Sequence, residues 1–384
     1  MKPLLEVLIP TYGRPESAAR AILSCAHVMN KDLVVSCNSN GFETKLEKFR
    51  DYSDGIRYSN FSYNRGVHLN FMELIKNSTG HYCMLLSDED ELESSALPKY
   101  LELLESFLDS NVRVISPYVY DPNVKRIYSS HGRINGLSLG LNEYLMMGEP
   151  ISGYMSGLTF HTESLKRVFT DSLSHNDPRN SYPHLDIVLK VLSNGGSAYF
   201  CSHQLVLKGN ESVYGGDSHA HRKHNDPKSS SSESYPTKCS TSDYNPDIYG
   251  PMARGRQFVY RQSVISTLKN ANLMSKNIAI LRLLLVNVNA VLKADSVVRL
   301  PFGASLIHLG IEGVTHDSLG KPMVTLYTWM FIAILKSPSF VQYFILCATA
   351  FAIRCVRAST TSILLIKSSM AGFITHIKFE AQNK

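Results

Sequence analysis

The sequence lacks the glycine-rich motifs that many nucleotide-binding domains use to hold phosphate. No G-x-G-x-x-G follows the first predicted strand, and no G-x-x-x-x-G-K-[ST] occurs in the 384 residues. The first absence argues against a dinucleotide-binding domain, and the second excludes a P-loop. A sheet that binds phosphate in this chain therefore has to neutralise its charge by other means.

Cysteine is also sparse and irregular. The seven cysteines are odd in number and never stand in C-x-x-C spacing, which argues against a disulfide framework and against a structural zinc site. The first nine residues show no charged segment followed by a long apolar run, so we expect no secretory signal. These features indicate reduced thiols in a cytosolic setting, and the 44% hydrophobic and 19% charged residues are typical of a globular protein.

The charge is divided unevenly along the chain. Residues 254–384 carry 15 Lys or Arg against 4 Asp or Glu, a net charge of +11, whereas residues 1–253 carry 24 against 29, a net charge of −5. A basic segment attached to an acidic body indicates an anionic partner for the segment. Lipid headgroups and nucleic acid both fit this charge.

The first 120 residues alternate between strand and helix patterns. Their alternation predicts a mostly parallel sheet with right-handed crossovers, and such sheets bind ligands at the carboxyl ends of their strands. Thr11, Asn38 and Asp88 would lie at those ends, and we expect Pro10 to end the first strand. The predicted strands are 4–9, 32–37, 81–87 and 112–120, and the predicted helices are 15–28, 41–50, 67–78 and 95–108.

An acidic run, Asp88 to Glu91, follows the third of these strands in the segment MLLSDEDEL. Asp88 and Asp90 have D-x-D spacing, which suits two carboxylates that hold Mg²⁺ or Mn²⁺, since these hard ions prefer oxygen ligands and leave positions open for phosphate. A solvated turn before a helix would give the same letters. The spacing alone therefore does not decide between the two.

Two longer segments resemble a known family. VLIPTYGRPESAARAILSC (7–25) is similar to the opening of family 2 glycosyltransferases, and NRGVHLNFMELIKNSTGHYCMLLSDEDEL (64–92) is similar to their approach to the D-x-D motif. Within the family, the chain most resembles abequosyltransferase-like bacterial enzymes of O-antigen or capsule synthesis, over roughly residues 4–205. The resemblance implies an α/β fold of the GT-A type, a nucleotide-diphosphate-sugar donor, Mg²⁺ or Mn²⁺, and inversion at the anomeric carbon.

The same resemblance assigns roles to individual residues. Asp90 would be the principal metal ligand, and Asp88 would face the ribose or the metal. The residues implied to bind the nucleotide sugar are Pro10, Thr11, Tyr12, Arg14, Asn38 and Asp88. One departure concerns the donor: Cys37 stands where the family commonly has an Asp that bonds the base or ribose, so the nucleotide is left open.

A second departure concerns the general base. Alignment on Gly195 places Pro183 and His184 at the family's acidic pair, with Asp186 two residues later. His184 and Asp186 would flank the apolar stripe of the helix 183–194, about 160° apart around its axis. Asp186 is our first candidate for the base and His184 the second; Asp177, Glu163 and a merely solvated helix flank remain open.

The domain organisation follows from these patterns. We expect a GT-A domain over 1–253 with a mobile polar loop at 209–250, and an α-helical region over 254–384. The apolar stretches 322–335 and 337–353 lie beside basic residues and are too short to span a bilayer, which favours helices in the membrane interface. A buried helical domain or an oligomer contact is the alternative.

The family resemblance, taken together with these features, implies an enzyme. It would transfer a sugar to an acceptor glycan, linked to undecaprenyl diphosphate, for bacterial O-antigen or capsule. It would be cytoplasmic and peripheral on the inner membrane surface, with no nucleic acid as partner. The alternative is a non-catalytic GT-A component of a membrane assembly complex for polysaccharide.

Overall fold

The structure of the protein is a computed structural model. It describes the ranges 2–26, 32–41, 44–65, 67–129, 134–147, 150–151, 154–173 and 183–209, and the isolated residues 267, 270–272, 275 and 279. The loop predicted after residue 209, the apolar stretches 322–335 and 337–353, and Asp177 lie outside these residues. The boundary predicted at 253/254 therefore stays a prediction.

Within the described residues the strands form one sheet in the order β3-β2-β1-β4-β9-β6-β10-β5, with β7 paired to β6 and β8 paired to β10. The strands are β1 (Leu5–Thr11), β2 (Leu33–Ser39), β3 (Ile56–Asn60), β4 (Tyr82–Leu85), β5 (Glu91–Leu92), β6 (Val112–Asp121), β7 (Arg126–Ser129), β8 (Ser138–Leu139), β9 (Thr159–His161) and β10 (Ser197–Leu207).

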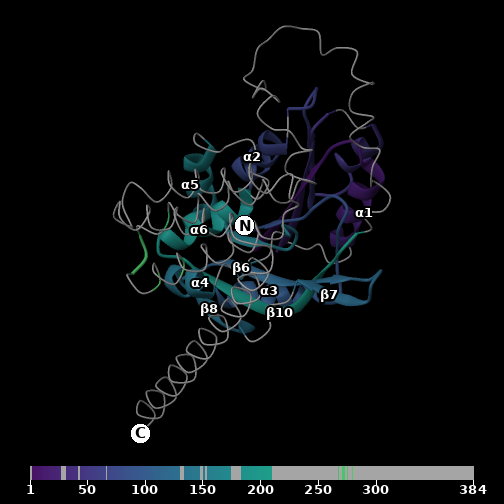
Figure 1. The fold of residues 1–384 in the computed structure, drawn as a ribbon. Coiled ribbons are helices and arrows are strands. Elements are labelled where there is room, and N and C mark those ends of the chain that lie inside the picture. The colour runs from purple at the N-terminus through teal and green to yellow at the C-terminus, as the bar shows by residue number, and fades with distance from the viewer. Residues whose placement is uncertain are drawn as a thin grey trace, which may run out of the picture.

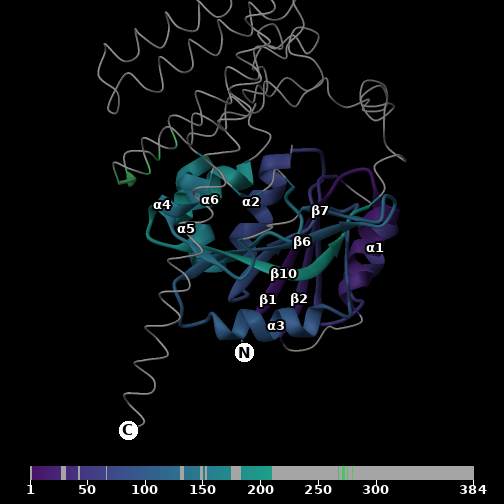
Figure 2. The ribbon, with the colours of Figure 1, turned by 60° about the horizontal axis from the view of Figure 1, so that its bottom comes forward.

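Helices cover both faces of the sheet (Figures 1 and 2). One core packs α2, α4, α5 and α6 against the sheet, and the other packs α1, the 3₁₀ helix η1 and α3 against the opposite face. The helices are α1 (Pro15–Ala26), η1 (Thr44–Phe49), α2 (Val67–Asn77), α3 (Leu97–Ser106), α4 (Leu141–Met147), α5 (Thr162–Leu173) and α6 (Pro183–Ser193).

The strand directions bring six carboxyl ends to one edge of the sheet. Strands β1, β2, β3 and β4 are mutually parallel. The short strand β9 is antiparallel to both β4 and β6, and β6 is parallel to β10. The six strands β1, β2, β3, β4, β6 and β10 therefore all end at this edge, where α/β sheets bind their ligands.

Most predicted elements are confirmed, with two corrections. Pro10 does not end the first strand, because β1 continues to Thr11. Only β2 still pairs with β1 at this point, since the ladder to β4 ends at Leu8, so the missing N–H of Pro10 is tolerated. The second correction is the segment predicted as a helix over 41–50, which is a 3₁₀ helix over Thr44–Phe49.

Residues from beyond the predicted loop return to this body. The backbone N–H of Asn272 donates to the side chain of Asn142 at 2.9 Å, and Ala279 is buried in the core that contains α6. Among the described residues, no helix is both long enough and apolar enough to cross a bilayer.

Candidate active site

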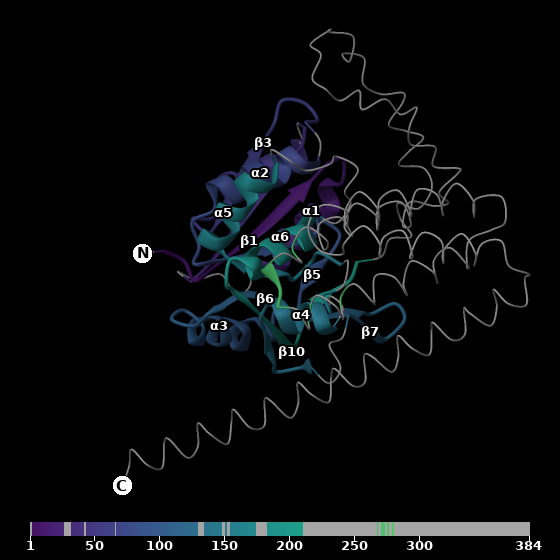
Figure 3. The ribbon, with the colours of Figure 1, turned by 60° about the vertical axis from the view of Figure 1, so that its left-hand side comes forward.

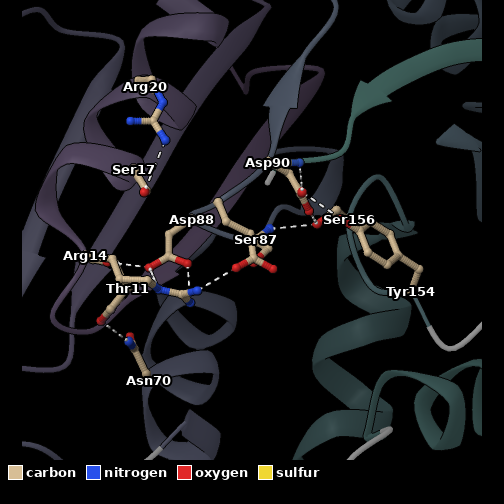
Figure 4. Close-up of polar contacts among 12 residues, drawn as sticks. Thr11, Arg14, Ser17, Arg20, Asn70, Ser87, Asp88, Asp90, Tyr154 and Ser156 are labelled. Atoms are coloured by element: carbon tan, nitrogen blue, oxygen red, sulfur yellow. Dashed lines mark hydrogen bonds and ion pairs between the residues drawn. The ribbon is translucent and has the colours of Figure 1, made fainter. Parts of the chain in front are cut away.

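The loop after β4 carries Asp88, whose carboxylate is enclosed by the last residue of β1 and by a residue of the loop that follows it (Figure 4). Arg14 donates from Nε to Oδ2 at 3.1 Å, and its Nη2 lies 2.5 Å from Oδ1. The hydroxyl of Thr11 donates to Oδ2 at 2.7 Å. Two strand ends are therefore joined by a two-pronged ion pair, an arrangement that suits the planar fork of arginine.

Arg14 also contacts the next acid in the run. Its Nη1 donates to Oε2 of Glu89 at 2.6 Å. Burial raises the pKa of Asp88 above its ordinary value, although the charge of Arg14 and the hydrogen bond from Thr11 act in the lowering direction. One guanidinium thus compensates two carboxylates, of which Asp88 is fully buried.

Asp90 points away from Asp88 and has neutral partners (Figure 4). The hydroxyl of Tyr154 donates to Oδ1 at 2.6 Å, the hydroxyl of Ser156 donates to Oδ2 at 2.5 Å, and the backbone N–H of Gly209 donates to Oδ1 at 2.8 Å. Burial raises the pKa of Asp90, while these hydrogen bonds and the charge of Lys208 lower it. A cation that replaces these donors would meet a desolvated carboxylate.

The segment that holds Asp90 depends on Gly157. This glycine has a φ of +86°, and a Cβ there would lie 2.7 Å from Val206 Cγ2 and 2.9 Å from Pro117 Cγ, so no other residue fits without displacement. Its N–H donates to the carbonyl of Leu85 at 2.8 Å. The neighbouring hydroxyl of Ser156 accepts the N–H of Ser87 at 2.9 Å, which fixes it between the strand end and the carboxylate.

The implied nucleotide residue Asn38 takes part in a buried amide network. Its Nδ2 donates to Asn70 Oδ1 at 2.8 Å, and its Oδ1 accepts from the hydroxyl of Ser59 at 2.7 Å. Asn70 in turn donates to the carbonyl of Thr11 at 3.2 Å. The network fixes the end of β1, so in this structure the side chain of Asn38 positions Thr11 through Asn70.

Tyr12 and Pro10 lie at the same strand end. The Tyr12 side chain is 39% exposed, and its ring lies against the backbone of Gly41, where an added Cβ would be 3.6 Å from the ring. Gly41 has a φ of +147°, which favours glycine at this position. The exposed ring thus has a rigid support at the carboxyl ends of β1 and β2, where an aromatic face can stack on a base.

The residue at the departure from the family pattern, Cys37, lies close to the same carboxylate. Its side chain is fully buried in β2. Burial raises the pKa of the Cys37 thiol, and the negative charge of Asp88 raises it further. Cys37 is therefore a neutral thiol beside the ion pair, with no carboxylate at this place.

The candidate bases lie on α6, and neither lies on a solvated flank of that helix, the alternative that the sequence left open. His184 and Asp186 are each 4% exposed, because α6 is covered on nearly all sides by α4, α5 and the sheet. Glu163, by contrast, begins α5 after the antiparallel strand β9, at the opposite edge of the sheet, and lies 3.7 Å from Lys2. The roles of Asp186 and His184 stay predictions. Glu163 lies at the opposite edge of the sheet, too far away to serve this site.

The described residues fit a metal ion that is held partly by the protein and partly by substrate phosphates and water. Among the described residues there is no group of three or more His, Cys, Asp and Glu that could hold an ion, so these residues form no all-protein cage. Mg²⁺ is often bound through one or two carboxylates together with substrate phosphates and water, and Asp90 suits that arrangement. Asp88 is already compensated by Arg14, and its role as a second ligand stays a prediction.

Several contacts of the site were not expected from the sequence. Tyr154 and Ser156 belong to no motif in the sequence, and Gly209 is the first residue of the predicted polar loop. Glu89 stands between the two aspartates of the D-x-D spacing and had no predicted role. No local pattern marks these residues, because each meets its partner through the pairing of distant strands.

Comparison with solved structures identifies the fold class. S. aureus TarS residues 1–349 in complex with UDP-GlcNAc match with a TM-score of 0.57 and 13% identity, and the complex with UDP matches with 0.55 and 13%. Each comparison covers 94% of this chain and 91% of the other. At this identity the likeness establishes the fold, and the expected GT-A architecture is confirmed.

Comparison of sequences shows a likeness to one family over part of the chain. Residues 6–165, less than half of the chain, match the family model described as Glycosyl transferase family 2. The chain is also 30% identical over 105 residues to GalNAc(5)-diNAcBac-PP-undecaprenol beta-1,3-glucosyltransferase of Campylobacter jejuni. That match covers 26% of this chain and 34% of the relative, so the chain spans about a third of the relative's length.

The ion pair of Arg14 and Asp88 predicts a measurable loss of stability. Arg14→Ala should lower the free energy of unfolding by about 3 kcal/mol, since it leaves a buried carboxylate without its cation. Urea unfolding followed by circular dichroism measures this. Adding Asp88→Asn should recover part of the loss. Arg20→Ala, which removes an exposed pair with Glu91, is the control and should cost less than about 1 kcal/mol; equal losses in the two alanine variants would contradict the assignment.

The hydrogen bond from Tyr154 to Asp90 predicts a change with pH. Tyr154→Phe removes a bond that lowers the pKa of Asp90, so that pKa should rise further and metal binding, which needs the ionised carboxylate, should fail at a higher pH. We expect the acid limb of Mn²⁺-dependent nucleotide binding, measured by calorimetry, to move up by about one pH unit. Tyr100→Phe, which removes a buried hydroxyl bonded to Thr159, should leave the limb in place. An unmoved limb in Tyr154→Phe would contradict the role given to this bond.

Proposed function

We propose that the chain is a metal-dependent inverting glycosyltransferase that moves a sugar from a nucleotide-diphosphate donor to a lipid-linked glycan. The observation that carries the proposal is Asp90, a buried carboxylate at the carboxyl edge of the sheet whose only charged neighbour among its described contacts is Lys208. It lies in the part of the chain that matches glycosyl transferase family 2. Such a carboxylate can receive a cation together with a diphosphate.

Different residues at this edge of the sheet would contact different parts of the donor. Tyr12, over Gly41, would stack on the base, and Thr11, fixed through the buried amides, would border the ribose together with Asp88. Arg14, which is 30% exposed, can turn part of its charge towards the diphosphate. Asp90 would hold Mg²⁺ or Mn²⁺, which when bound would stabilise the negative charge that develops on the diphosphate leaving group. UDP-GlcNAc, which one TarS structure contains, is the first donor to test.

Inversion requires one general base at the acceptor. The acceptor hydroxyl would give its proton to that base while its oxygen attacks the anomeric carbon, and the bond from this carbon to the diphosphate oxygen would break on the opposite side. Asp186 is the preferred base and His184 the alternative. Both are buried, and a base shielded from water suits a reaction in which hydrolysis of the donor has to be avoided.

A lipid-linked acceptor is supported by the C. jejuni relative, whose name specifies an undecaprenol-linked diphosphate. The net charge of +11 over residues 254–384 supports attachment to an anionic membrane surface. We therefore place the enzyme at the inner face of the cytoplasmic membrane, in the assembly of surface polysaccharide such as O-antigen or capsule. The transferred sugar and the linkage are left to the donor screen.

One observation, at Cys37, supports a second candidate function. Cys37 replaces a carboxylate that family members use for the donor nucleotide, and it is buried beside Asp88. A chain that has lost donor binding would retain the fold as a non-catalytic member of an assembly complex. The two functions are separated by the donor measurements below.

Asp90→Asn should abolish sugar transfer and the metal-dependent stabilisation by donor, because it removes the charge that holds the ion but little volume. For the wild type, a donor at 100 times its Kd raises the free energy of unfolding by about 2.7 kcal/mol, visible as a thermal shift with UDP-GlcNAc and Mn²⁺ and lost in EDTA. Asp109→Asn, an exposed change in the turn after α3, is the control. Transfer that persists in Asp90→Asn or in EDTA would reject the metal role; no donor effect in the wild type, with any nucleotide sugar, would favour the non-catalytic function.

Asp186→Asn should lower kcat by a factor on the order of 10²–10⁴, the usual contribution of a general base, with donor affinity unchanged. Single-turnover kinetics with a saturating donor separate this effect from binding. His184→Ala, two residues earlier on α6, is the matched variant, and it should retain most of the rate. An active Asp186→Asn together with an inactive His184→Ala would transfer the role to His184.

A further inference from the structure

The turn between β6 and β7 presents an unusual set of exposed side chains. Among the described residues, five large hydrophobic side chains are exposed, and only Val124 (54%) and Ile127 (44%) are aliphatic. Between them stand Lys125 and Arg126, which are also exposed. Neither cation has an ion-pair partner among the described residues. Two aliphatic and two cationic groups therefore occupy four consecutive positions.

This hairpin tip, defined as residues 124–127, is held by a rigid base. Asp121 Oδ1 accepts the backbone N–H groups of Asn123 at 3.0 Å and Val124 at 3.4 Å, which fixes the turn. The backbones of Asp121 and Arg126 also lie opposite each other in the antiparallel ladder of β6 and β7. Lys125 adopts a φ of +49°, a conformation that costs free energy and persists only where the surrounding turn enforces it.

The hairpin tip lies at the edge of the sheet that carries the candidate active site. Strand β6 ends at the same edge as β1 and β4, and the hairpin projects from there (Figure 3). Lys208 connects the two: its N–H donates to the carbonyl of Tyr120 at 2.7 Å, and its Nζ lies 3.8 Å from Asp121. The next residue, Gly209, donates to Asp90. A surface that meets the hairpin tip is therefore close to Asp90.

We propose that the hairpin tip inserts into the interface of an anionic lipid bilayer. Val124 and Ile127 would enter the boundary between headgroups and acyl chains, and Lys125 and Arg126 would contact anionic headgroups. Aliphatic groups next to uncompensated cations have the composition of interfacial membrane contacts. A specific protein interface needs roughly 20 residues on each side, and a four-residue tip is too small to form one. A membrane contact that adds to other attachments can be this small.

The contact would serve the proposed function, but it does not require sugar transfer. A bilayer held at the hairpin tip would lie along the edge where β1 and β4 end, so that a lipid-linked acceptor could reach the site without leaving the membrane. The edge of the sheet that carries the amino ends of these strands would face away. The proposal thus assigns an orientation, which a binding measurement on the whole chain alone would not reveal.

The test places a fluorescent probe at the hairpin tip of the full chain. The only tryptophan is Trp329, so Ile127→Trp in a Trp329→Phe background reports on the tip alone. Asn194→Trp in the same background is the control, because Asn194 is exposed and precedes the amino end of β10 at the opposite edge. The vesicles contain phosphatidylglycerol and brominated phosphatidylcholine, which quenches tryptophan within the bilayer. No donor or acceptor is added.

We expect a blue shift and quenching for Ile127→Trp and neither change for Asn194→Trp. Replacing Lys125 and Arg126 by Glu in the Ile127→Trp chain should raise the lipid concentration needed for half-quenching at least about tenfold, and vesicles of phosphatidylcholine alone should quench weakly. Val124→Trp provides a second probe if Ile127→Trp folds poorly. Absence of quenching at the tip, or equal quenching at both edges, would overturn the proposal, whether or not the chain transfers sugar.

Discussion

The ion pair between Arg14 and Asp88 is the interaction on which the candidate site depends. Asp88 is fully buried at the end of a strand whose neighbours are apolar, and a charge in that position is stable only with a cation and hydrogen-bond donors beside it. Arg14, in the loop after β1, supplies the cation, and Thr11, the last residue of β1, supplies a further donor. The pair therefore fixes the loops after β1 and β4 against each other, and these loops carry the remaining residues of the site.

The two aspartates of the D-x-D spacing consequently have different tasks. Asp88 is compensated inside the protein by Arg14, whereas Asp90 is held by the hydroxyls of Tyr154 and Ser156 and by one backbone N–H. Neutral donors stabilise a carboxylate without cancelling its charge. The ionised carboxylate of Asp90 would therefore have only the charge of Lys208 near it among its described contacts, whereas Asp88 is paired with Arg14. The separation follows from the direction in which each side chain points across the same turn.

The sequence allowed much of the fold to be predicted, but less of the site. The alternation of apolar strands and helices over the first 120 residues predicted the parallel half of the sheet, and the acidic run after a buried strand predicted the edge at which the carboxylates lie. The partners of Asp90 could not be predicted, because they are 64, 66 and 119 residues away in the chain. Tyr154 and Ser156 are brought there by β9, a three-residue strand inserted antiparallel between β4 and β6, which is too short for a periodic pattern. The burial of His184 and Asp186 was missed for a related reason: an apolar stripe predicts one covered face of a helix, whereas α6 is covered on almost all sides.

Charge balance at the site is consistent with a neutral residue at position 37, where the resemblance implies an aspartate. The thiol of Cys37 is buried close enough to Asp88 for the charge of that carboxylate to raise its pKa. An aspartate in its place would set another carboxylate near Asp88, which already shares the guanidinium of Arg14 with Glu89. Like charges at such distances raise each other's pKa and oppose ionisation. A small neutral side chain at position 37 leaves Arg14 with no further charge to compensate, so Cys37 is consistent with an intact ion pair at Asp88, whatever nucleotide the site accepts.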